Sequence, residues 1–187
     1  MIRGYKGFYV GGITKYGQQL EVGRDYSVDG PLKVGIHNQK GNGFHMCERM
    51  EDVFYFFPRE NFIIAEVLGS DENIKFDQTY WGLENMYTCR SIRLVRFLTR
   101  EEMINHMLGL SPHNNTIFIM NFSLTDSETD LFLDRFRGDY KLFSQILFYQ
   151  KGYKNIYELD ADSANRIVKS ELKRKDKKKG KSKIIEY

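Results

Sequence analysis

The sequence predicts an α+β fold, with a mixed, mostly antiparallel sheet, a flanking helix and a helical C-terminal half. Two observations predict it: short aromatic-rich segments separated by glycine turns fill residues 3–98, and apolar residues recur at helical spacing after residue 99. The 187 residues, 41% of them hydrophobic, are enough for a packed core. We expect an α+β domain at 1–109, a helical subdomain at 110–160 and a partly disordered basic tail at 161–187.

The strand predictions rest on three segments. Residues 5–10 are rich in β-favouring aromatic residues and end at the turn signal Gly11-Gly12. Residues 62–69 form a near-continuous apolar run, which is typical of a central strand covered on both faces. Residues 91–98 alternate between polar and apolar, which predicts a half-buried strand. The stretch 70–90 between the last two gives no clear pattern.

A short strand at 43–47 is followed by a predicted helix from Arg49 to Phe57, which Pro58 ends. Its apolar residues stand at helical spacing, and Glu51 and Asp52 lie in the first turn, where negative charge suits the helix dipole.

The C-terminal half carries helix start and stop signals. Thr99 and Glu102 form a capping box before a helix that ends at Gly109. From Asp126 to Tyr157 the pattern is again helical and is broken at Gly138. The second helix of that stretch has an apolar arc that includes one polar misfit, Gln150, and Gly152 ends it.

Composition narrows the class of protein. No apolar run approaches the ~18 residues of a membrane span, and no secretory signal is apparent at the N-terminus. Two cysteines, Cys47 and Cys89, do not make a disulfide framework, so we expect an intracellular setting, cytoplasmic or nuclear. The glycine clusters fit neither a phosphate-binding loop nor a dinucleotide fingerprint, so no cofactor is predicted.

The C-terminal segment is strongly basic. Residues 166–183 contain ten basic and two acidic residues, a net charge of +8, so the rest of the chain carries −5 of the total of +3. Such a run attracts nucleic acid, acidic protein or anionic lipid, whereas the alternative is a solubilising or nuclear-localisation segment. The predicted nucleic-acid-binding residues are Lys173, Arg174, Lys175, Lys177, Lys178, Lys179, Lys181 and Lys183. No aromatic residue lies between Arg166 and Lys183, so contact is expected with the phosphate backbone.

His45 and Cys47 are two residues apart, so in a strand they point to the same face. Two ligands are too few for a structural zinc site. A Cys/His nucleophilic pair is the second interpretation, but no local signature supports it. The third, a buried thiol on a packed strand, agrees best with how free cysteines usually behave, and we therefore expect Cys47 to be buried.

The chain is rich in aromatic residues, with 14 Phe, 12 Tyr and one Trp. Most of them are expected in the core, because each buries a large apolar area. A platform for stacking nucleic-acid bases is the alternative, and it requires exposed aromatic residues beside basic ones.

Several segments resemble an uncharacterised domain family of phages, bacteria and giant viruses. The family's motifs "YKGF", "VGKxY" and "GFHxC" correspond to Tyr5–Phe8, Val22–Tyr26 (with Arg24 in place of the lysine) and Gly43–Cys47, and the similarity covers residues 5–105. The family has no activity to transfer. The resemblance implies a viral or phage-type accessory protein that binds a macromolecular partner.

A remoter similarity is to ADP-ribosyltransferases of the histidine-tyrosine-glutamate type. Their aromatic strand and following helix resemble 43–57 in layout, with Tyr5 in the first strand, His45 in place of the nicotinamide-stacking tyrosine and Glu66 as the glutamate. The nicotinamide-ribose histidine has no match. This resemblance implies a transferase with Tyr5, His45 and Glu66 as catalytic residues, or an inactive relative of one.

Overall fold

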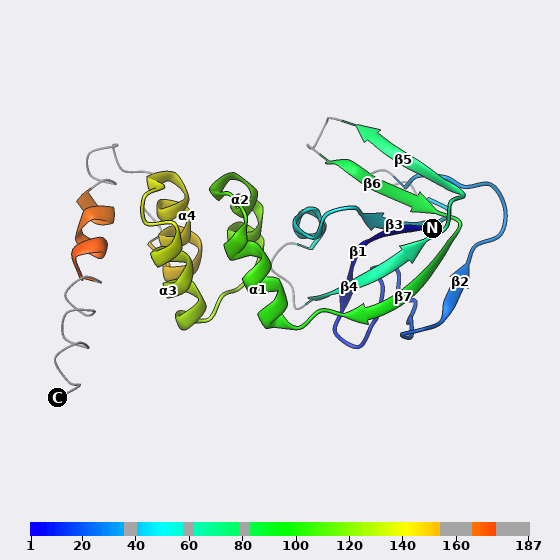
Figure 1. Cartoon of the computed structure of the whole chain (residues 1–187), viewed down its shortest axis with the longest axis horizontal. Coiled ribbons are helices and arrows are strands. Elements are labelled where there is room, and N and C mark those ends of the chain that lie inside the picture. The colour runs from blue at the N-terminus through cyan, green and yellow to red at the C-terminus, as the bar shows by residue number, and fades with distance from the viewer. Residues whose placement is uncertain (36–40, 58–61, 79–82, 154–165, 175–187) are drawn as a thin grey trace. The chain divides into compact units, whose positions relative to one another are not determined.

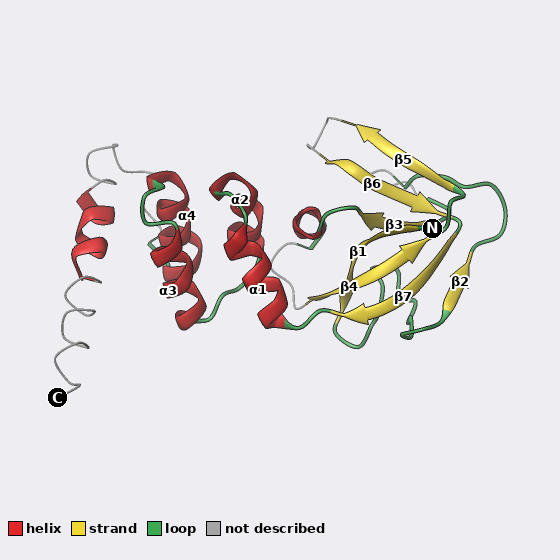
Figure 2. Cartoon of the chain, viewed as in Figure 1, coloured by secondary structure: helices red, strands yellow, loops and turns green. Residues whose placement is uncertain are grey.

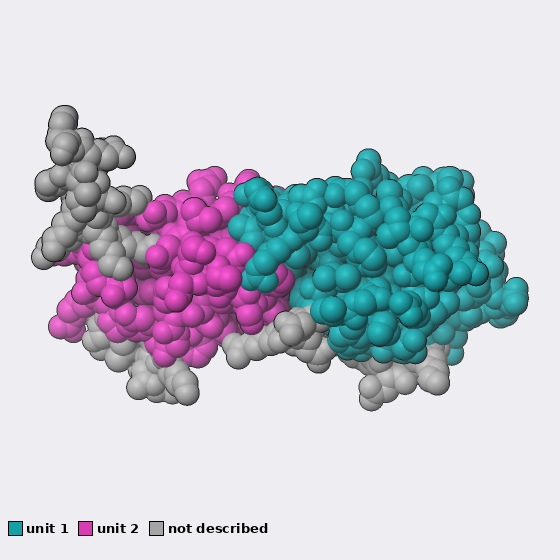
Figure 3. Space-filling model, turned by 90° about the horizontal axis from the view of Figure 1, so that it is seen from below, with its two compact units in different colours: residues 1–106 teal, residues 107–187 magenta. Residues whose placement is uncertain are grey.

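The computed structural model describes residues 1–35, 41–57, 62–78, 83–153 and 166–174. The chain divides into two compact units, residues 1–106 and residues 107–187 (Figure 3). Strands dominate the first unit and helices dominate the second (Figure 2). The predicted α+β class is therefore confirmed, with an antiparallel sheet in the N-terminal half and helices in the C-terminal half.

The described part of the first unit contains a seven-stranded sheet in the order β2-β7-β4-β1-β3-β6-β5 (Figure 1). Its strands are β1 (Ile2–Tyr9), β2 (Asp25–Ser27), β3 (Phe44–Cys47), β4 (Phe62–Gly69), β5 (Asn73–Gln78), β6 (Leu83–Cys89) and β7 (Ser91–Phe97). The apolar strand β4 lies between β1 and β7, so its predicted central place is confirmed. The stretch without a clear pattern supplies β5 and β6, which pair antiparallel.

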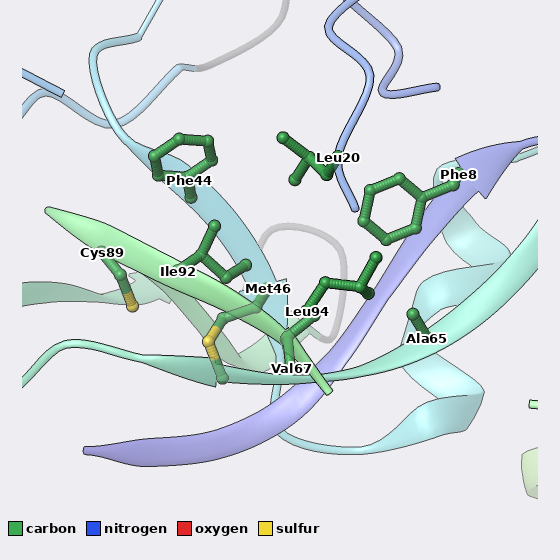
Figure 4. Close-up of a cluster of buried hydrophobic side chains, with 9 residues drawn as sticks. All are labelled: Phe8, Leu20, Phe44, Met46, Ala65, Val67, Cys89, Ile92 and Leu94. Carbon is green, nitrogen blue, oxygen red and sulfur yellow. The ribbon is translucent and has the colours of Figure 1, made fainter. Parts of the chain in front are cut away.

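One face of the sheet carries a cluster of buried apolar side chains (Figure 4). Its members come from strands that neighbour one another in the sheet and from the loop after β1: Phe8, Leu20, Phe44, Met46, Ala65, Val67, Cys89, Ile92 and Leu94. Side chains alternate along a strand, so Gly7 lies on the opposite face from Phe8. A Cβ atom on Gly7 would lie 2.2 Å from the ring of Phe57, so only glycine allows this close packing.

The segment after β3 is the 3₁₀-helix η1 (Met50–Tyr55), so a helix lies where one was predicted from Arg49 to Phe57, but it is shorter than predicted and of the 3₁₀ type. Five consecutive residues, 50–54, are buried and only Tyr55 of this helix is exposed, so the segment lacks the broad polar face that an amphipathic α-helix presents to solvent. A 3₁₀-helix is the usual solution for such a short piece of chain.

The helices are α1 (Arg100–Gly109), α2 (Pro112–Asn121), α3 (Asp126–Arg135) and α4 (Tyr140–Lys151), and residues 166–174 are also helical. The capping box before α1 is confirmed: Thr99 Oγ1 accepts from the Glu102 N–H at 3.1 Å, and the Glu102 carboxylate accepts from the Thr99 N–H at 2.7 Å. Among the described residues, no helix is long and apolar enough to cross a membrane.

The polar misfit on α4 has a structural role in the second unit. Gln150 Nε2 donates to the carbonyl oxygens of Ile119 and Phe122, and its Oε1 accepts from the Leu124 N–H. One side chain of α4 thus satisfies backbone groups at and just after the C-terminal end of α2, where carbonyls otherwise lack partners. Gly152 follows α4 with a φ of +72°, so its predicted role as the helix stop is confirmed.

Candidate functional site

The sheet register brings the predicted catalytic residues onto neighbouring strands. Tyr5 on β1 lies directly opposite Glu66 on β4 and directly opposite Cys47 on β3. His45 precedes Cys47 by two positions on β3 and pairs with Thr88 on β6. Tyr5, Glu66 and His45 therefore lie on adjacent strands. The described hydrogen bonds of Glu66 and His45, however, are made with residues outside this set of three.

Glu66 is held by two arginines. Its side chain is 10% exposed, and its two carboxylate oxygens accept hydrogen bonds from Arg3 and Arg96, both at 2.9 Å. The bond from Arg3 does most to lower the pKa of this carboxyl below its ordinary value, with Arg96 adding to it against the opposing effect of burial. Glu66 is therefore an ionised structural partner and not a proton donor at neutral pH.

His45 is neutral and partly buried. Its Nε2 accepts a hydrogen bond from the Gly35 N–H at 3.2 Å. Burial, and to a smaller extent the positive charge of Lys6, lowers its pKa to about 4. A ring in this state accepts a hydrogen bond but does not carry a positive charge near neutral pH.

Lys6 is a charged group at this site that the sequence analysis missed. Its Nζ donates to the backbone oxygen of His45 at 2.8 Å, close to where β1 and β3 pair at Tyr5 and Cys47. Burial lowers its pKa to about 8. The ammonium thus supplies a hydrogen bond between two strands that share a single register pair.

The thiol of Cys47 is 4% exposed, which confirms the prediction that it is buried on β3. Burial raises its pKa, and burial likewise raises the pKa of Cys89 to about 11. Both thiols are neutral at physiological pH and are poor nucleophiles. Among the described residues, no group of three or more His, Cys, Asp or Glu side chains could hold a metal ion.

A second charged cluster, also missed from the sequence, lies at η1. Arg49 donates two hydrogen bonds to Asp52, at 3.0 and 3.1 Å, and His106 Nε2 lies 3.2 Å from the carboxylate of Glu51. Asp52 is 3% exposed, and burial raises its pKa against the opposing effect of Arg49. Glu51 and Asp52 lie in the first turn of a helix, as predicted, and their carboxylates are also packed with partners, which the sequence did not indicate.

An open hollow of about 490 Å³ lies in the second unit. The two charged residues that line it are both hydrogen-bonded to the backbone. Arg135 donates to the Leu108 carbonyl, and Asp139 accepts from the Leu142 N–H. We therefore see no set of free polar groups converging on it.

The C-terminal basic segment begins on a packed helix, residues 166–174. Val168 is 1% exposed, and Glu171 accepts from the Tyr153 hydroxyl at 2.8 Å and pairs with Arg174 at 3.0 Å. Lys173 and Arg174 are exposed at the end of this helix. The other predicted binding residues lie outside the described residues: Lys175, Lys177, Lys178, Lys179, Lys181 and Lys183.

No model of a protein family matches this sequence, and comparison with curated proteins and with solved structures gives no match either.

Proposed function

We propose that this protein is an accessory binding protein that attaches to polyanions, nucleic acid above all, through its C-terminal basic segment. The proposal is supported chiefly by the position of the basic residues at the end of the helix 166–174 and after it. The helix 166–174 is packed through Val168 and Glu171, exposes Lys173 and Arg174 at its end, and is followed in the sequence by six more basic residues before 184. The viral or phage-type setting stays a prediction from the resemblance.

The chemistry of the segment favours phosphate contacts over base recognition. Residues 166–183 hold a net charge of +8 and no aromatic side chain. Lysine is a flexible point charge, and each phosphate that a lysine neutralises releases a counterion. The affinity for duplex DNA should then fall with salt, with a logarithmic slope of about −0.9 for each phosphate contacted.

Truncation after Arg174 tests the proposal and leaves every described residue in place. Compared with the full chain, we expect the truncated chain to bind labelled duplex DNA and RNA at least about tenfold more weakly at low salt, with a flatter salt dependence. The matched control is Lys141→Gln, which removes an exposed lysine of α4 and should bind as the wild type does. Equal binding by full and truncated chains, or no binding by either at low salt, would overturn the proposal.

The alternative proposal is an ADP-ribosyltransferase-like enzyme or an inactive relative. The register that places Tyr5 opposite Glu66 is the observation in its favour. Against activity, both oxygens of Glu66 already accept from arginines, and the His45 ring accepts from the Gly35 N–H. Release of nicotinamide from NAD by the full chain, abolished by Glu66→Gln, would support this alternative.

A further inference from the structure

The phenylalanines are shielded from solvent, whereas a few tyrosines are exposed to it. All 14 phenylalanines are described, and each is buried or partly buried. The exposed aromatic side chains in the described part of the chain are all tyrosines: Tyr16, Tyr55 and Tyr140. Tyr16 is 73% exposed, against 40% and 49% for the other two. Because the ring of Tyr16 is largely exposed, packing in the folded protein does not explain why an aromatic residue stands at this position.

Tyr16 lies at the tip of a hydrogen-bonded turn after β1. The Thr14 N–H donates to the Gln18 carbonyl at 2.8 Å, the Gly17 N–H donates to the Thr14 carbonyl at 2.9 Å, and Thr14 Oγ1 accepts from the Gln18 N–H. Thr14 is 6% exposed, and Gly17 has a φ of +83°, which glycine adopts without strain. The backbone of the tip is thus ordered before any ligand arrives, and this ordering lowers the entropic cost of binding.

The charges around Tyr16 suit a polyanion. Lys15 is exposed beside it, and Lys15 is the sole charged residue in the sequence from Gly7 to Leu20. The other exposed tyrosines also have a basic neighbour, Lys141 next to Tyr140 and Arg49 near Tyr55, but each has a carboxylate close by as well: Tyr140 follows the N-cap Asp139, and Asp52 helps to raise the pKa of Tyr55. A phosphate would be repelled near those two but not by the sequence neighbours of Tyr16.

We propose that Tyr16 stacks on a base of single-stranded nucleic acid while Lys15 contacts the adjacent phosphate. Proteins that bind single strands without sequence preference combine aromatic side chains that stack on bases with basic groups that contact the backbone, and Tyr16 and Lys15 offer one of each. The inference deepens the proposed function and rests on it, because the basic segment supplies the general attraction to phosphate. Tyr16 adds a preference for unpaired bases, since the bases of a duplex are already stacked on each other.

Three substitutions in the full chain separate stacking from apolar contact. Tyr16→Ala should weaken binding to a labelled oligouridylate about 5- to 150-fold, the loss expected for one stacked base, and leave binding to a duplex of equal length unchanged. Tyr16→Phe keeps the ring and should bind like the wild type. Tyr16→Leu keeps apolar area without a π face and should bind as weakly as Tyr16→Ala. Leu131→Ala, which truncates an apolar residue that is 52% exposed, is the matched control and should have no effect.

The outcomes also separate this inference from the proposed function. If truncation after Arg174 abolishes binding to oligouridylate and Tyr16→Ala does not weaken it, stacking is overturned and the role of the basic segment stands. If Tyr16→Leu binds as the wild type does, or if Tyr16→Ala weakens binding to phosphatidylserine vesicles but not to oligouridylate, the loop makes an apolar or membrane contact and the inference is overturned. Thermal melts of each variant that match the wild type show that the losses come from binding.

Discussion

The two units of this chain bury different kinds of polar group. The first unit buries charged side chains, namely Glu51, Asp52 and Glu66, and partly buries Lys6. In the described part of the second unit, the buried polar residues are neutral: Asn115, Thr129 and Gln145. Neutral groups such as Asn115, which donates to the Met107 and Ser111 carbonyls, keep their hydrogen bonds at any pH. Charged groups keep theirs only in one protonation state. The charged residues of the second unit, such as Glu171 and Lys151, are at most partly buried, so pH dependence of stability should originate mainly in the first unit.

The largest expected effect is a core truncation in the second unit. Phe132 is fully buried, with its ring centroid 5.4 Å from that of Phe118 and 6.0 Å from that of Phe136. Phe132→Ala should lower the free energy of unfolding by about 3–5 kcal/mol, through lost burial and a residual cavity. Because this neighbourhood is aromatic, the loss should be the same in acidic and neutral buffer.

Leu131→Ala is the matched control for that measurement. Leu131 precedes Phe132 on α3 but is 52% exposed, so its truncation should change the free energy of unfolding little. Urea denaturation of both variants would measure the difference. A strongly pH-dependent loss for Phe132→Ala would contradict the division between a charged and a neutral interior.

Local signals were predictable from the sequence because both partners lie close together in the chain. Thr99 and Glu102 are three residues apart, and the capping box formed as predicted. The strand predicted at 43–47 is present as β3, which contains both His45 and Cys47, and Gln150 stood out as a polar residue on an apolar arc. The helix α2 was missed: its first half, Pro112–Asn115, is polar, and Asn115 is buried there by hydrogen bonds to backbone oxygens.

The charged interior of the first unit was not predictable in the same way. Glu66 is 63 residues from Arg3 and 30 from Arg96, so their contact depends on the strand order and register. From the sequence, Lys6 is indistinguishable from an ordinary surface lysine on a strand. Its hydrogen-bond acceptor is the backbone oxygen of His45, 39 residues away in the chain. Glu66 was selected through a family resemblance, and the structure places it in an ion pair that no spacing rule indicates.

The second expected effect concerns this ion pair. Glu66→Gln should lower the free energy of unfolding by about 1–2 kcal/mol at neutral pH, a modest figure because Arg3 and Arg96 are largely exposed and regain water. The folded-state pKa of Glu66 is below its ordinary value of 4.5, so its contribution is complete above pH 4.5 and is lost as the pH falls through the folded-state pKa.

The control for Glu66 is Glu72→Gln. Glu72 also pairs with an arginine, Arg90, but its side chain is 60% exposed, so the variant should unfold like the wild type. Denaturation curves at neutral pH and well below pH 4.5 would compare the two variants. A loss for Glu66→Gln that persists unchanged in acid would show that its charge is not what stabilises the fold.

The third expected effect, similar in size to that of Glu66→Gln, is the pH response of Lys6. Burial lowers its folded-state pKa from 10.5 to about 8, so between these values the unfolded chain holds a proton that the folded chain has released. Stability from this group therefore rises as the pH increases from 8 to 10.5. Because the side chain is only partly buried, we expect a rise of about 1–2 kcal/mol, below the full value for such a shift. Lys6→Met should lack the rise.

The buried thiols oppose the rise that Lys6 causes, because their raised pKa values make the unfolded chain lose protons first. The measured quantity is therefore the wild-type free energy of unfolding minus that of the Lys6→Met variant at each pH. His45 stays neutral throughout this range and does not contribute. The control is Lys141→Met, which replaces an exposed lysine of the second unit. Its free energy of unfolding should depend on pH as that of the wild type does. A difference between wild type and Lys6→Met that stays constant from pH 8 to 10.5 would place the Lys6 ammonium in water and remove it from the charged interior of the first unit.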